Sequence, residues 1–136
     1  MTDFVAPFAR KLLLLWISLF ALALTACSSA SPEDVVKNFF EAAAANRVDE
    51  AIEYFSLRDV KENDLTAAKG KLQIIVGQTY SNIQKNGGLD SITTTLVEQK
   101  EDTARVKVEI KFKNGKSSDQ HKNLVKDSGK WKIVLK

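Results

Sequence analysis

The strongest constraint in this sequence is a change of composition at residue 27. The segment before it, KLLLLWISLFALALTAC, is nearly free of charge, whereas the residues after Pro32 mix charged and apolar side chains throughout. Arg10 and Lys11 precede the apolar residues 12–24, as a positively charged region precedes an apolar region in a secretory signal peptide. This layout predicts that residues 1–26 are removed and that the folded domain follows them.

Two other interpretations of the apolar segment are less favourable. It has 13 residues, fewer than the ~20 that a helix needs to span a bilayer, which disfavours an uncleaved membrane anchor. The segment is also apolar on every side, whereas a helix packed against a globular core keeps a polar face toward water. A signal peptide therefore explains the segment best.

Cys27 is the only cysteine in the chain, and four roles compete for it: half of a disulfide, a metal ligand, a nucleophile, or a site of lipid attachment. A single cysteine has no partner for an internal disulfide. Structural metal sites take several Cys or His ligands, and here Cys27 and His121 are the only two residues of these types. A nucleophile needs a neighbouring base and a pocket, but Cys27 ends a segment that we expect to be cut from the fold. Lipid attachment is the role that remains.

The residues Leu24, Thr25, Ala26 and Cys27 resemble the lipobox, the processing signal of bacterial lipoproteins. The resemblance implies that a diacylglyceryl group is attached to the thiol of Cys27, that the chain is cleaved between Ala26 and Cys27, and that the new amino terminus is acylated. Ser28 looks like the outer-membrane default of a host with two membranes. The alternative is an ordinary signal peptide that leaves a free thiol, and it provides no reason for an odd cysteine in an exported protein.

A lipidated Cys27 would make the membrane itself the first partner of the chain. Two or more acyl chains give stable anchoring, since each buried methylene contributes roughly 0.8 kcal/mol. The tether, residues 27–31, has four residues after the cysteine and reaches at most about 14 Å. We therefore expect one domain, residues 32–136, held close to the bilayer in the cell envelope and facing the periplasm or the exterior.

The sequence of the domain predicts helices in its first half and strands in its second half. Ser31 and Pro32 are an N-cap and a first helical residue, and they open a helix over residues 31–46. Further helices are expected over 48–56 and 64–86, where apolar residues recur at helical spacing. Gly70 and Gly77 interrupt the last of these helices. Either they lie under a closely approaching element, or they are tolerated at about 1 kcal/mol each.

Alternating apolar residues mark the strands. Residues 103–113 alternate cleanly and predict a half-buried strand, and residues 89–99 predict an earlier one. Asn114-Gly115 indicates a hairpin, and a second hairpin turns at residues 127–129. Its closing strand is expected to place Trp131, Ile133 and Leu135 on the inner face. The fold class is therefore α+β, with about three helices packed on a curved antiparallel sheet of about four strands.

The segments SPEDVVKNFFEAAAANRVDEAIEYFS and LVKDSGKWKIVL resemble a bacterial lipoprotein family of unknown function in the nuclear-transport-factor-2-like (cystatin-like) superfamily. The resemblance covers most of residues 31–136. It implies a cone-shaped fold whose sheet curls around the helices and can leave a pocket. It implies no chemistry, because this fold hosts both enzymes and binding modules.

One candidate pocket cluster depends on the register of the first hairpin. A two-residue loop at Asn114-Gly115 would turn Asp119, His121 and Asn123 inward, toward the cone. A three-residue loop would reverse the strand and turn all three toward solvent. The polar run KSSDQHKN is more typical of an exposed edge strand or loop.

Basic residues dominate the other face of the strand at 103–113. They are Arg105, Lys107, Lys111 and Lys113, with Glu109 between them. Such a face can attract anionic lipid headgroups, but a solvated sheet face explains it more simply. The formal net charge of the whole chain, +3, is too mild to indicate nucleic-acid binding.

The sequence contains no glycine-rich phosphate loop, no paired carboxylates and no metal-ligand spacing. We therefore expect no catalytic residue, no metal and no cofactor, and a domain that serves as a non-catalytic binding or interaction module for a protein or small ligand of the envelope. One alternative is a small enzyme that uses the cone pocket. Another is a structural homodimer through the open sheet face, since the sequence does not define the oligomeric state.

Overall fold

The computed structural model describes residues 30–135. The expected signal peptide, its cleavage site between Ala26 and Cys27, and the lipid-attachment residue Cys27 lie outside the described residues. Within residues 30–135, none of the helices is long and apolar enough to span a membrane. The helices are α2 (Pro32–Ala44), α3 (Val48–Glu53), the 3-10 turn η1 (Glu62–Asp64) and α4 (Leu65–Lys85), and the strands are β1 (Leu89–Gln99), β2 (Thr103–Phe112), β3 (Ser117–Asp127) and β4 (Lys130–Ile133).

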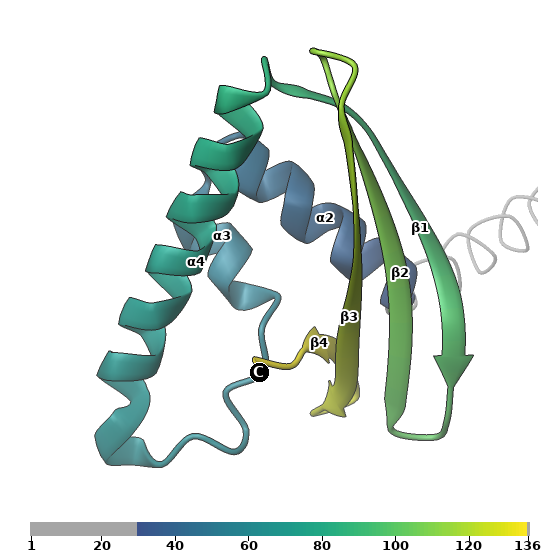
Figure 1. Ribbon diagram of the computed structural model, residues 1–136. Coiled ribbons are helices and arrows are strands. Elements are labelled where there is room, and N and C mark those ends of the chain that lie inside the picture. Colours follow the sequence, from purple (N-terminus) through teal and green to yellow (C-terminus); the bar gives the residue numbers. More distant parts are fainter. Residues whose placement is uncertain (1–29, 136) are drawn as a thin grey trace, which may run out of the picture.

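The four strands form one antiparallel sheet in the order β1-β2-β3-β4, and the helices lie against a single face of it (Figure 1). Helix α2 is the central element, because it contacts β1, β2 and β4 on one side and α3 and α4 on the other. Helix α4 packs mainly on α2 and α3 rather than on the sheet. This arrangement confirms the α+β prediction.

Helix α2 begins where the sequence predicts. The backbone N–H of Asp34 donates to Oγ of Ser31 at 3.2 Å, and Pro32 occupies the first turn. Such a cap satisfies a backbone donor that the helix itself leaves unpaired. The helix buries an apolar stripe in which the rings of Phe39 and Phe40 meet edge to face at 5.0 Å, and Phe39 meets Phe55 of the following segment at 5.1 Å.

The core lies between α2 and the inner face of the sheet. Its strand residues alternate along β2 as predicted, and all of them are buried: Ala104, Val106, Val108, Ile110 and Phe112. From the other strands, Leu124, Trp131 and Ile133 complete the apolar layer.

The first hairpin has a three-residue loop, so the two-residue register is wrong. The backbone N–H of Phe112 donates to the carbonyl of Lys116 at 2.9 Å, which leaves residues 113–115 in the loop. Gly115 has φ 87°, a left-handed conformation that favours glycine and is typical of the last residue in a three-residue loop. Asn-Gly therefore predicts the hairpin correctly but not its length.

The closing strand is shorter than predicted. β4 ends at Ile133, where the backbone N–H of Ile133 donates to the carbonyl of Tyr54 and the backbone N–H of Ser56 donates to the carbonyl of Ile133. Trp131 and Ile133 are buried on the inner face, as expected. Leu135 follows the end of the strand and is 36% exposed, so its predicted place on the inner face of the sheet is wrong.

Candidate functional site

Asp119, His121 and Asn123 do not come together in a pocket in this structure. They pair with Glu109, Lys107 and Arg105 of β2, respectively. Opposed residues share a face, and the β2 partners lie on the face away from the helices. Asp119 and His121 are exposed, and Oδ2 of Asp119 lies 3.9 Å from Nζ of Lys107. The predicted cluster is therefore part of the outer sheet surface.

The inner face of β3 carries the intervening residues instead. Gln120 and Lys122 pair with Val108 and Val106, whose side chains are buried under α2. Nζ of Lys122 lies 5.8 Å from the centroid of the Phe40 ring. Burial lowers the pKa of Lys122 from its ordinary value of 10.5, because the charged amine loses hydration.

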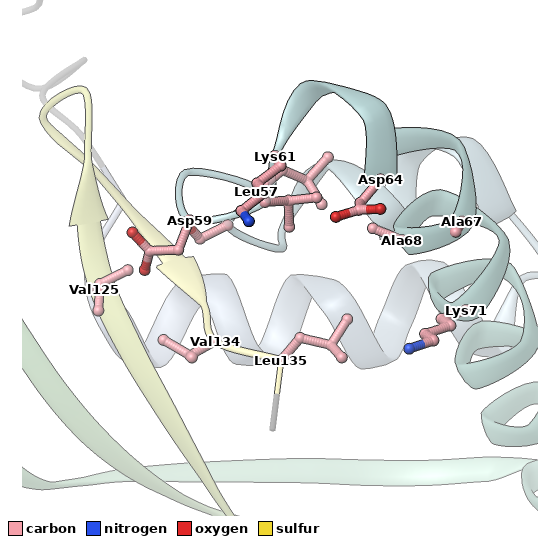
Figure 2. Close-up of a pocket in the computed structure, with 12 residues that line it drawn as sticks. Leu57, Asp59, Lys61, Asp64, Ala67, Ala68, Lys71, Val125, Val134 and Leu135 are labelled. Atoms are coloured by element: carbon pink, nitrogen blue, oxygen red, sulfur yellow. The ribbon is translucent and has the colours of Figure 1, made fainter.

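A cavity with a volume of about 560 Å³ lies at the open end of the cone. We call it the loop–helix pocket. It is enclosed by the loop after α3, the first turns of α4 and the segment that follows β4 (Figure 2). Its apolar lining residues are Leu57, Val60, Ala67, Ala68, Val125, Val134 and Leu135.

Helix α4 is bonded to the first hairpin at the end that lies away from the pocket. There, the side-chain amide of Asn114 donates to Oδ1 of Asn86 at 3.0 Å, and the backbone N–H of Asn114 donates to the carbonyl of Asn86. At the near end, residues 56–64 hold the start of α4 away from the sheet, and Leu135 lines the space between them.

Charged groups surround the apolar lining. Asp59 and Asp64 supply carboxylates, and Lys61 and Lys71 supply amines. All four residues are exposed, so water screens their charges. An apolar interior with charged groups of both signs fits an amphipathic small molecule.

The lining offers little that could perform covalent chemistry. Oγ of Ser56 donates to Oδ2 of Asp127 at 3.0 Å and accepts the backbone N–H of Arg58 at 3.3 Å. The histidine, His121, lies on the outer face of the sheet and does not line this pocket. Across residues 30–135, no group of His, Cys, Asp and Glu side chains could hold a metal ion.

Sequence reasoning missed this pocket. Leu57 and Val60 are the only apolar residues between Phe55 and Leu65, and their spacing resembles that of an ordinary surface loop. Nothing in the local sequence of residues 56–64 indicates that they will face residues 134 and 135, which lie at least 70 positions further along the chain.

The fold defines an α+β protein of the NTF2-like class. A crystal structure from Campylobacter jejuni, described as that of a "Putative NTF2-like transpeptidase", matches this chain with a TM-score of 0.72 and 25% sequence identity. The match covers 79% of this chain and all of the other. Residues 25–134 match the family described as "Domain of unknown function (DUF4878)", and the chain belongs to that family. No protein with a curated description matches it.

Proposed function

We propose that this chain is a lipid-anchored lipoprotein of the cell envelope and that its NTF2-like domain is a non-catalytic binding module. The observation that carries the binding role is the loop–helix pocket. Its volume of about 560 Å³ lies within the ~300–1,000 Å³ typical of small-molecule sites, and its lining combines an apolar interior with charged groups. We infer that the ligand is a small amphipathic molecule.

The anchor rests on the order of features around Cys27. The family match begins at residue 25, and helix α2 begins at Pro32. The uncharged apolar segment therefore precedes the domain, and Cys27 stands five positions before the first helix. Acylation of Cys27 would hold the domain at the membrane without a spanning helix.

Fractionation of cells tests the anchor. Wild-type protein is expected in the membrane fraction after a high-salt wash and in the detergent extract, because acyl chains do not depend on charge. A Cys27→Ala chain should keep its signal segment and run as a larger species. Wild-type protein that washes off in salt would contradict the anchor.

Two probes of equal chain length test the pocket: decanoate and decyltrimethylammonium. We expect saturable changes in the amide NMR signals of Val60, Ala68 and Leu135 with at least one of them. Ala67 is exposed and lines the pocket, so Ala67→Trp should fill the space and weaken binding without disturbing the core. Ala45→Trp is the matched control, since Ala45 is exposed at the end of α2 and outside the pocket. Equal binding by both variants, or no saturable change, would exclude this pocket as the site.

An enzyme is the second candidate, favoured by the transpeptidase description of the Campylobacter jejuni protein. Such chemistry needs a nucleophile, and the hydroxyl that lines the pocket here belongs to Ser56, which is bonded to Asp127. A serine-reactive fluorophosphonate tests this alternative. We expect no labelling of the wild-type protein, whereas labelling that disappears in Ser56→Ala would favour the enzyme.

A further inference from the structure

A second cavity lies beside the point where the described chain begins. It has a volume of about 310 Å³, and Ala30 forms part of its wall. Its other walls come from Val35 of α2, from the end of α3 and from β4. Trp131 and Tyr54 provide its aromatic surface.

The position of Ala30 fixes this cavity relative to the anchor. Ala30 is three residues after Cys27, and three extended residues reach about 11 Å at most. If Cys27 is acylated, its sulfur lies at the membrane surface. The wall of the cavity at Ala30 would then lie within about 11 Å of the anchored sulfur and close to the headgroup layer.

The charges around the cavity suit that location. Lys130 and Lys132 line it, and Glu53 is the single carboxylate in its lining. Lys126 pairs with Trp131 in the sheet, and its Nζ lies 5.3 Å from the centroid of the Trp131 ring. Among the described residues, no carboxylate lies within 4.0 Å of any of these three amines. Three amines near a membrane surface each attract anionic lipids.

The aromatic residues fit the same location. Trp and Tyr are enriched where a membrane meets water, because each combines an apolar ring with a polar group. Trp131 is 7% exposed, and Tyr54 is half-buried with its hydroxyl directed to Glu50. The Tyr54 ring is therefore partly exposed at this cavity, whereas the Trp131 ring is buried in the core and lines the cavity with a small part of its surface.

We propose that Lys126, Lys130 and Lys132, with Tyr54 and Trp131, form an anchor-side surface that docks on anionic phospholipid headgroups. This inference rests on the proposed lipid anchor and adds a second contact, which sets the orientation of the domain. The docked domain would turn the β3–β4 end toward the membrane. The β2–β3 hairpin, at the other end of the strands, would then point away from it (Figure 1).

The basic outer face of β2 fits this role less well. Lys107 lies 3.9 Å from Asp119, and Lys111 lies 3.8 Å from Glu109. Carboxylates on the same face would be repelled by anionic lipids. Among the described residues, none of the three amines of the anchor-side surface lies within 4.0 Å of a carboxylate, and Nζ of Lys132 donates to the backbone carbonyl of Glu53. Ala30 lies within this surface.

The test uses the acylated protein in lipid vesicles. The sequence has two tryptophans, Trp16 and Trp131, and processing at Cys27 removes the first. Fluorescence of the mature protein therefore reports on Trp131 alone. The protein is placed in phosphatidylcholine vesicles with and without phosphatidylglycerol, each containing a lipid with a nitroxide on its headgroup. We expect stronger quenching in the anionic vesicles and loss of the difference in high salt.

Two double variants, each of which removes two positive charges, distinguish docking through the anchor-side surface from a general attraction of the basic protein to anionic vesicles. Lys130→Gln with Lys132→Gln should lower the ratio of docked to undocked protein by about 25-fold, since each basic residue contributes about fivefold. Lys113→Gln with Lys116→Gln removes the same charge from the far hairpin and should leave quenching unchanged. Equal effects of the two pairs would overturn the inference.

An intact mass of the protein, measured beside the quenching, distinguishes failure of the proposed lipid anchor from failure of the anchor-side surface. An acylated protein whose quenching is the same in neutral and anionic vesicles overturns the anchor-side surface and leaves the anchor intact. A protein without acyl chains overturns the proposed anchor and the inference that rests on it. The comparison of vesicles uses wild-type protein, so it does not depend on whether a variant folds.

Discussion

At the scale of single residues, Lys122 is a cation placed among apolar groups. Burial lowers its pKa in the folded protein below the ordinary 10.5 of the unfolded chain. The unfolded state therefore binds more protons between those two pKa values, and folding becomes more favourable as pH rises through that window. Below the window, the charged amine weakens the fold by a constant amount.

Lys122→Met is expected to stabilise the domain near pH 7 by about 0.5 kcal/mol, a small value because solvent reaches part of the side chain. Methionine keeps the apolar contact with Phe40 without a charge. The advantage should shrink as pH approaches 10.5. Urea unfolding at pH 7 and pH 10 measures both effects, with the exposed Lys37→Met as control. An advantage that grows with pH would contradict the account.

Gly70 and Gly77 are tolerated interruptions of α4 and do not mark a close approach. No atom outside the local helix lies within 4 Å of the position that a Cβ would occupy at either residue. Gly70→Ala and Gly77→Ala should each raise the free energy of unfolding by about 1 kcal/mol. Gly115→Ala is the opposite control. At its φ of 87°, the same change should cost about 1–2 kcal/mol. Thermal unfolding distinguishes the signs, and a loss of stability at Gly70 or Gly77 would show that a glycine is required there.

At the scale of elements, the helices and strands could be predicted because their signals are local. Ser31 and Pro32 define the start of α2, and the alternation along β2 defines its buried face. The inner residues of β3 could not be predicted in the same way. Which β3 residues face inward depends on whether the loop at Asn114-Gly115 has two or three residues, and the Asn-Gly dipeptide is compatible with both lengths.

Asn114 connects two elements that are distant in sequence. Its side chain bonds to Asn86 at the end of α4 and accepts the backbone N–H of Lys116 at 2.9 Å. Asn114→Ala should therefore cost about 1–2 kcal/mol and speed hydrogen exchange in residues 82–88. Asn63→Ala, at an exposed position in η1, is the control and should change neither quantity. Unchanged exchange in residues 82–88 would show that the bond does not hold the helix end.

At the scale of the whole molecule, the loop–helix pocket depends on distances that no local pattern encodes. Its opening is set by where α4 begins relative to the end of β4, and those segments meet only after the whole chain has folded. For the same reason, the sequence could indicate a cone but could not identify the residues that line its open end.

The outer sheet face bears on the homodimer alternative. In β2 and β3 it presents charged and polar groups, among them Lys107, Glu109, Asp119 and His121. Interfaces of permanent dimers bury mainly apolar surface, so we expect the domain to stay monomeric. Sedimentation of the detergent-free domain across a wide concentration range tests this expectation, and a stable dimer would restore the structural alternative.

An intact mass of the membrane-extracted protein is the decisive measurement for the proposed anchor at Cys27. We expect a chain that starts at Cys27 and carries the mass of its acyl groups, with both features lost in Cys27→Ala. A full-length unmodified chain would mean an uncleaved N-terminal anchor. A cleaved chain without acyl mass would mean an exported domain with a free thiol, and either result would show that Cys27 does not carry a lipid anchor.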